Sequence, residues 1–135
     1  MKYSVDKQDR YTIFKLNEDK LTSVHAPVLK SDLVLLHNEG VKNLVFDLSA
    51  VEFVDSSGLS AILTGNRLYK SGGSFVVTGI EHPHVKNLIS ISKVDTVLDI
   101  IPTLEESVEF VYMEDLQREL MEGEEGVDED DSESK

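Results

Sequence analysis

The sequence predicts a single α/β domain whose mixed, mostly parallel β-sheet is flanked by short α-helices. The chain has 135 residues, which is the usual length of one domain. Short apolar segments rich in β-branched and aromatic residues alternate with segments of helical period, the order in which helices connect parallel strands. The first two strand-like segments are close enough in sequence to form an antiparallel hairpin, so we expect a mixed sheet.

The first part of the chain predicts a hairpin, a helix and a buried strand. Residues 2–6 and 11–16 have strand composition and are separated by a polar turn. Pro27 suits the first turn of a helix, where its missing N–H costs nothing. Residues 41–48 contain a continuous apolar run, typical of a strand buried on both faces. The apolar face of the helix is expected to consist of Val28, Leu29, Leu33, Val34 and Leu36.

The second part of the chain predicts three helices and two strands. A helix over residues 57–70 should end at Gly72 and Gly73, and a last helix should begin at a capping box formed by Thr103 and Glu106 and continue to about residue 120. The apolar residues of that last helix favour packing on the domain, and part of them could instead form a docking or dimer surface. The remaining elements are a strand over 75–79, a helix over 84–92 and a strand over 97–101.

The net charge of −13 is concentrated near the end of the chain. Residues 122–135 carry eight acidic residues and one base, whereas the other 12 bases are scattered over residues 1–121. We therefore expect a folded domain over residues 1–121 and a disordered acidic tail over 122–135, which either solubilises the protein or binds a basic partner. Scattered bases lack the positive face of a nucleic-acid-binding protein, so direct binding to DNA or RNA is not expected.

Composition also limits the chemistry and the compartment. No apolar stretch is long enough to cross a bilayer, and the first residues lack the apolar run of a signal peptide, so we expect a cytoplasmic protein without membrane insertion. The chain has no cysteine, which excludes disulfides and thiolate catalysis. His82 and His84 could chelate a metal, but without matching ligands a polar loop that caps the third helix explains them better. No cofactor is expected.

The candidate site is the run Asp55, Ser56, Ser57 and Gly58 between a strand end and a helix start. A hydroxyl here would lie among the free N–H groups of the first helical turn, at the positive end of the helix dipole, where a phosphate is stabilised. Gly58 would let the backbone approach a partner, and Asp55 and Ser57 offer hydrogen-bonding atoms. From the spacing alone, an ordinary helix N-cap is the better explanation of this run.

Residues 44–59 as a whole resemble the signature segment of STAS domains, a family typified by anti-sigma factor antagonists. In that family a buried strand ends in an aspartate, and a phenylalanine shortly precedes an Asp-Ser-Ser/Thr-Gly-Leu run at a helix start. Residues 72–77, 85–88 and 97–100 are similar to later parts of the family pattern, so the resemblance covers roughly residues 3–115. The matching positions of the signature are Asp47, Phe53, Asp55, Ser56, Ser57, Gly58 and Leu59.

The resemblance implies a STAS-like fold and a partner-switching function. An anti-sigma factor that is also a serine kinase with a GHKL-type ATPase fold would bind the domain and phosphorylate Ser56, and a phosphatase would reset it. The domain itself would be a phosphoacceptor and binding module, not an enzyme. The partner would contact Asp55, Ser57 and Gly58 and the helix face beyond them, at Ser60, Thr64 and Arg67.

Two other functions are considered for the same motif. A STAS subunit could act as an unphosphorylated adaptor in a lipid-transport ATP-binding cassette system or another complex, but the intact Asp55-Ser56-Ser57-Gly58 run favours the phosphorylated switch. A hydrolase with Ser56 as nucleophile would need a base, and no recognised motif supplies one.

Overall fold

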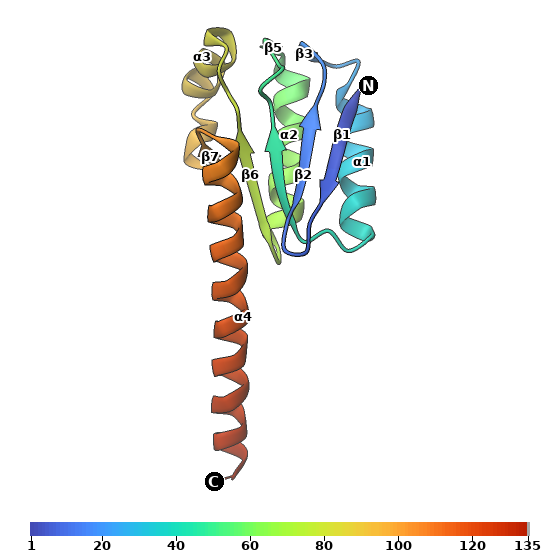
Figure 1. Ribbon diagram of the computed structural model, residues 1–135. Helices are drawn as coiled ribbons and strands as arrows, with labels where there is room; N and C mark the ends of the chain where they lie inside the picture. Colours follow the sequence, from blue (N-terminus) through green and yellow to red (C-terminus); the bar gives the residue numbers. More distant parts are fainter. Residues whose placement is uncertain (135) are drawn as a thin grey trace.

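The protein is built around a five-stranded sheet with the strand order β1-β2-β4-β6-β7 (Figure 1). The computed structural model describes the backbone of residues 1–134 and the side chains of residues 1–123. β1 and β2 pair antiparallel as the predicted hairpin, and every other neighbouring pair in this sheet is parallel. The mixed, mostly parallel sheet is therefore confirmed. Its strands are β1 (Tyr3–Lys7), β2 (Thr12–Leu16), β4 (Asn43–Asp47), β6 (Ser74–Thr78) and β7 (Asp99–Ile101).

A second, two-stranded sheet lies beside the ends of the main strands. It pairs β3 (Lys20–Leu21) with β5 (Phe53–Val54) in parallel, so that Leu21 lies opposite Val54. This short pairing brings the loop after β3 close to the start of the helix that follows β5, and it thereby positions the candidate site.

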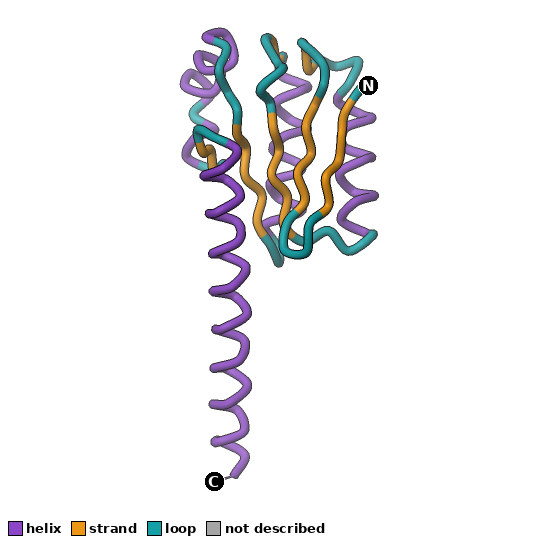
Figure 2. Tube along the Cα trace, in the orientation of Figure 1, coloured by secondary structure: helices purple, strands orange, loops and turns teal. Residues whose placement is uncertain are grey.

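The helices lie on both faces of the main sheet, as Figures 1 and 2 show. α1 (Ala26–Asn38) and α2 (Ser56–Lys70) pack side by side on one face, and α4 (Leu104–Ser134) crosses the other face over β4 and β6. α3 (Pro83–Ser92) follows β6 and contacts β5. The predicted elements are confirmed in order and kind. The last strand begins later than predicted because Val94–Thr96 form a short 3₁₀ helix before β7.

Alternating side chains of the central strands separate two apolar clusters. Leu44 and Phe46 of β4 enter the large core under α1 and α2, whereas Val45 points to the opposite face. There Val45 and Val76 of β6 pack against Val111 of α4, and all three side chains are fully buried. A parallel strand covered on both faces therefore needs an unbroken apolar run, which is the pattern seen in the sequence.

In α1 the predicted apolar face is too wide. Leu29, Leu33 and Leu36 are buried, but Val28 and Val34 are exposed, so their assignment to the core is wrong. Each of these valines is adjacent in sequence to a buried leucine and so is turned by about 100° from it. The buried Tyr69 hydroxyl donates to the Leu33 carbonyl at 2.7 Å and joins α2 to α1, and burial raises its pKa well above the ordinary value.

The last helix begins where the capping box predicts. Thr103 Oγ1 accepts from the Glu106 N–H at 3.2 Å and lies 2.8 Å from the Glu106 carboxylate. The burial of Val111 confirms that the helix packs on the domain. The boundary expected between residues 121 and 122 falls inside α4. Disorder of residues 122–135 stays a prediction, since side chains from residue 124 onward lie outside the described residues.

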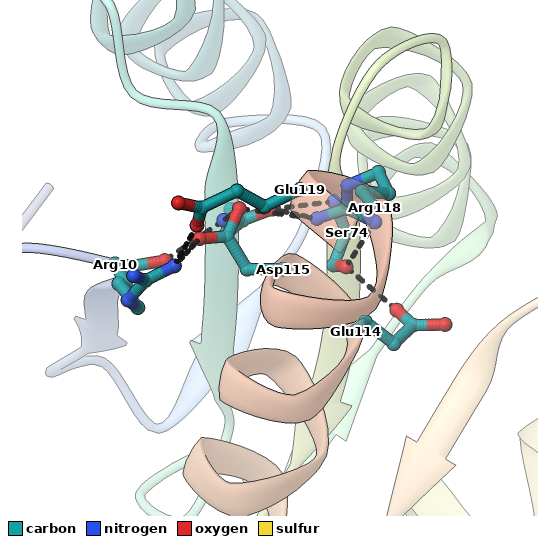
Figure 3. A network of polar contacts seen from close by, with 7 residues as sticks. Arg10, Ser74, Glu114, Asp115, Arg118 and Glu119 are labelled. Atoms are coloured by element: carbon teal, nitrogen blue, oxygen red, sulfur yellow. Dashed lines mark hydrogen bonds and ion pairs between the residues drawn. The ribbon is translucent and has the colours of Figure 1, made fainter. Parts of the chain in front are cut away.

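A polar network attaches the middle of α4 to the amino ends of β4 and β6 (Figure 3). Asp115 accepts from the Asn43 amide at 2.9 Å and from Arg10 at 3.0 Å. Arg118 donates to Oδ1 of the Asn43 side chain at 2.6 Å and to the Ser74 hydroxyl at 3.2 Å. Desolvation alone would raise the pKa of Asp115, but these hydrogen bonds and the nearby cations outweigh it, so the pKa is lowered. α4 is thus held by charge as well as by apolar packing.

Candidate functional site

The site is the junction at which β5 ends and α2 begins. Asp55 is the N-cap of α2, and its Oδ1 accepts from the Gly58 N–H at 2.8 Å. The other oxygen, Oδ2, accepts from the Ser23 N–H at 3.1 Å, in the loop between β3 and α1. The Asp55 N–H donates to the Leu21 carbonyl at 3.1 Å. One residue therefore fixes the helix start and ties it to a loop 32 positions earlier.

Ser56 is the first residue of α2, one position earlier than predicted, and it is exposed. Because Asp55 supplies the cap, the N-cap explanation does not apply to the Ser56 hydroxyl, which makes no hydrogen bond to any of the described residues. This hydroxyl lies in the first turn of α2, at the positive end of the helix dipole, where the Gly58 and Leu59 N–H groups already donate to Asp55. The position is accessible to another protein and suited to an anion.

Gly58 is buried, and its backbone lies close to Leu21 of the same chain. A Cβ atom at this position would lie 2.3 Å from the Leu21 carbonyl oxygen. The glycine therefore lets α2 start directly against β3, and its contact with a partner stays a prediction. Ser57 is half-buried next to it.

The other predicted site residues lie along one outward face of α2. Ser60 and Arg67 are exposed and Thr64 is half-buried. The Thr64 hydroxyl donates to the Ser60 carbonyl at 3.0 Å, and Arg67 donates to the Thr64 hydroxyl at 3.3 Å. With a rise of about 1.5 Å per residue, Arg67 lies about 16 Å along the axis from Ser56, too far to pair with a phosphate there. Its place fits contact with a partner instead.

Sequence reasoning missed two apolar groups that flank the junction. Val24 follows Ser23 in the loop held by Asp55, and it is largely exposed. Phe53 was noted as a family position, but the sequence did not reveal that its ring is partly exposed and lies 4.7 Å from the ring of His84. An apolar residue between polar neighbours in a loop was the available signal for Val24. Together with the α2 face, these groups form a mixed polar and apolar surface.

Of the two histidines near the start of the third helix, His82 has a structural role. His82 is the N-cap of α3, and its Nδ1 accepts from the His84 N–H at 3.2 Å, as the capping prediction stated. Over the described part of the chain, no group of three or more histidine and carboxylate side chains is arranged to hold a metal ion. No described helix is long and apolar enough to cross a membrane.

The strand order, the two helical layers and the exposed serine at the start of α2 define a STAS domain. The STAS domain family matches residues 2–107, and the chain belongs to this family. A protein of Bordetella bronchiseptica named "Putative anti-sigma factor antagonist BtrV" is 29% identical over 93 residues, which is 68% of this chain and 78% of the relative.

Solved structures of anti-sigma factor antagonists have the same fold. One from Mycobacterium paratuberculosis is 24% identical with a TM-score of 0.74, and the match covers 82% of this chain and 93% of that chain. Unphosphorylated SpoIIAA is 16% identical with a TM-score of 0.70, over 82% and 96% of the two chains. SpoIIAA, a cell fate determinant of Bacillus, has also been solved in its phosphorylated form, which matches with a TM-score of 0.63, 16% identity and coverage of 82% and 99%.

Proposed function

We propose that this chain is an anti-sigma factor antagonist that binds an anti-sigma factor with serine kinase activity and is switched by reversible phosphorylation of Ser56. The observation that carries the proposal is the position of Ser56, exposed at the first residue of α2 while Asp55 performs the capping. The hydroxyl is therefore free to react without the loss of a hydrogen bond that holds the fold.

The helix start can hold the phosphate once it is added. An anion at a helix N-terminus is stabilised by about 0.3–1 kcal/mol at an exposed position, because the positive end of the helix dipole faces it. The phosphate adds about −1.5 to −2 charges. On a surface shaped for docking, that charge weakens kinase binding through repulsion and desolvation, so the product of the reaction leaves its enzyme.

The docking surface combines the outward face of α2 with the groups beside it. Ser60, Thr64 and Arg67 continue in line with Ser56, and Val24 and Phe53 add apolar area at the same end of the domain. As the family resemblance implies, the kinase would be of the GHKL ATPase type, and a separate phosphatase would restore the unmodified form. The chain acts as substrate and ligand, and not as an enzyme. Because the kinase uses ATP, this function belongs in the cytoplasm.

The test is direct phosphorylation. The protein is incubated with ATP and a candidate kinase of the GHKL type, and its intact mass is compared for the wild type, Ser56→Ala, and the matched controls Ser57→Ala and Ser60→Ala. We expect a gain of one phosphate in every protein except Ser56→Ala. A phosphate that persists in Ser56→Ala would rule out the site.

Binding provides a second readout. Ser56→Asp should weaken the complex with the kinase by about tenfold or more, which is about 1.4 kcal/mol. Unchanged affinity would contradict the charge mechanism. If the protein instead copurifies with a transporter ATPase and never gains a phosphate, the adaptor function replaces the switch.

A further inference from the structure

α4 carries a stripe of apolar residues on its outer face that are exposed or half-buried in the described part of the chain. Met113 is 63% exposed and Leu120 is 69% exposed, and the half-buried Leu116 lies between them. These residues are spaced by three and four, so they share one side of the helix. Val111, which packs on the sheet, points to the opposite side. We refer to Met113, Leu116 and Leu120 as the outer face.

Charge is divided very unevenly between this helix and the rest of the chain. Residues 1–103 contain 12 acidic and 11 basic residues, a net charge of −1, whereas residues 104–135 contain 14 acidic and two basic residues, a net charge of −12. Glu109 and Glu119 are exposed on α4 beside the outer face. Arg118, the one base among residues 104–123, points inward to Asn43 and Ser74. Glu119 pairs with Arg10 at 2.7 Å, so the negative charge that borders the apolar stripe is only partly compensated.

We infer that the outer face of α4 docks an amphipathic helix of a partner protein, whose apolar stripe is flanked by lysine or arginine. Apolar residues three and four apart on one helix provide anchors for the apolar residues of another. The acidic border attracts a basic partner and gives the pairing its specificity. A second copy of this chain fits poorly, because face-to-face packing would bring the two acidic borders together.

This surface is separate from the surface around Ser56. α2 covers one face of the main sheet and α4 the other, so both surfaces can be occupied at the same time (Figure 1). Arg118 reaches the first residues of β4 and β6, the helix continues past the amino ends of these strands, and Leu120 beyond it is exposed. Docking on α4 would therefore leave phosphorylation of Ser56 unaffected.

The test uses the full chain and two synthetic helical peptides of about 20 residues, long enough for about five turns. Both carry leucine at heptad a and d positions, flanked by lysine in one peptide and by glutamate in the other. Fluorescence anisotropy should show the lysine peptide binding at least about tenfold more tightly. Met113→Ser and Leu120→Ser should each weaken that binding several-fold, and the double variant at least about tenfold. The control Leu35→Ser, at a 56% exposed apolar residue of α1, should leave it unchanged.

Three results would overturn the inference. Equal binding of the two peptides would show that charge gives no selectivity. Equal binding by the wild type and the double variant would show that the acidic residues attract the peptide without the apolar face. Sedimentation of the wild type as a dimer, with Leu120→Ser as a monomer, would make a second copy the occupant. Circular dichroism of each variant checks that α4 and the domain remain folded.

Discussion

Replacement of Asp55 by alanine tests whether this carboxylate, and not the Ser56 hydroxyl, holds the start of α2. The change removes the cap of the Gly58 N–H and the hydrogen bond from the Ser23 N–H. Loss of an N-cap costs about 1 kcal/mol. The second bond goes to a charged group at an exposed loop, where water partly replaces it, so it adds about 0.5–1 kcal/mol. We expect the free energy of unfolding to fall by about 1.5–2 kcal/mol.

Urea denaturation followed by circular dichroism measures this loss as a shift of the midpoint at constant slope. Asp55→Asn keeps a cap acceptor and should lose less than about 1 kcal/mol. Ser56→Ala should change the stability by less than about 0.5 kcal/mol, as expected for an exposed residue without a partner. If Ser56→Ala destabilises the domain as much as Asp55→Ala does, the capping assignment, and with it the free hydroxyl at Ser56, is wrong.

Two further predictions concern packing and pH. Gly58→Ala should lower the free energy of unfolding by about 2–3 kcal/mol or prevent folding, because the added Cβ would collide with the Leu21 backbone. The control Gly72→Ala, whose Cβ would have no atom within 4 Å, should be nearly neutral in the same urea assay. Asp115→Asn should lower the free energy of unfolding by about 1–2 kcal/mol at pH 7. Folding lowers the pKa of Asp115 below the value of about 4 that it has in the unfolded chain. The ionised carboxylate therefore stabilises the domain fully above about pH 4, and this contribution is lost as the pH falls through the pKa of the folded state. Urea titrations at pH 7, 5 and 3 should show that the difference in free energy of unfolding between wild type and variant becomes smaller at pH 3. A difference that stays constant would refute the ionic role of Asp115.

The architecture could be predicted because its signals are local. The apolar run of β4, the proline at the start of α1 and the capping box of α4 each act within a few residues, and the structure has the corresponding elements. The extent of the α1 face could not be predicted as reliably. Val28 and Val34 are apolar enough for a core position, but the packing of neighbouring elements decides which side of the helix is buried, and these two valines are exposed.

At the candidate site, too, the local features could be predicted from the sequence and the contacts between distant residues could not. The motif placed Ser56 correctly at a helix start, yet the work of Asp55 and Gly58 depends on Ser23 and Leu21, more than 30 positions away. Nothing in the motif itself indicates that β3 pairs with β5 and brings those partners near. Two residues expected to contact a partner, Asp55 and Gly58, also make contacts within the chain, to Ser23 and to Leu21 of β3, which the motif could not reveal.

The uneven distribution of charge gives the two surfaces different responses to ionic strength. A molecule with a net charge of −1 over residues 1–103 and −12 over residues 104–135 has a large electric dipole, and a basic protein in dilute salt is drawn toward α4 from a distance. At about 0.15 M salt this attraction is screened beyond about 8 Å. Association at α4 should therefore slow markedly as salt is added, whereas association at the unphosphorylated α2 surface, borne by the nearly neutral body, should change little.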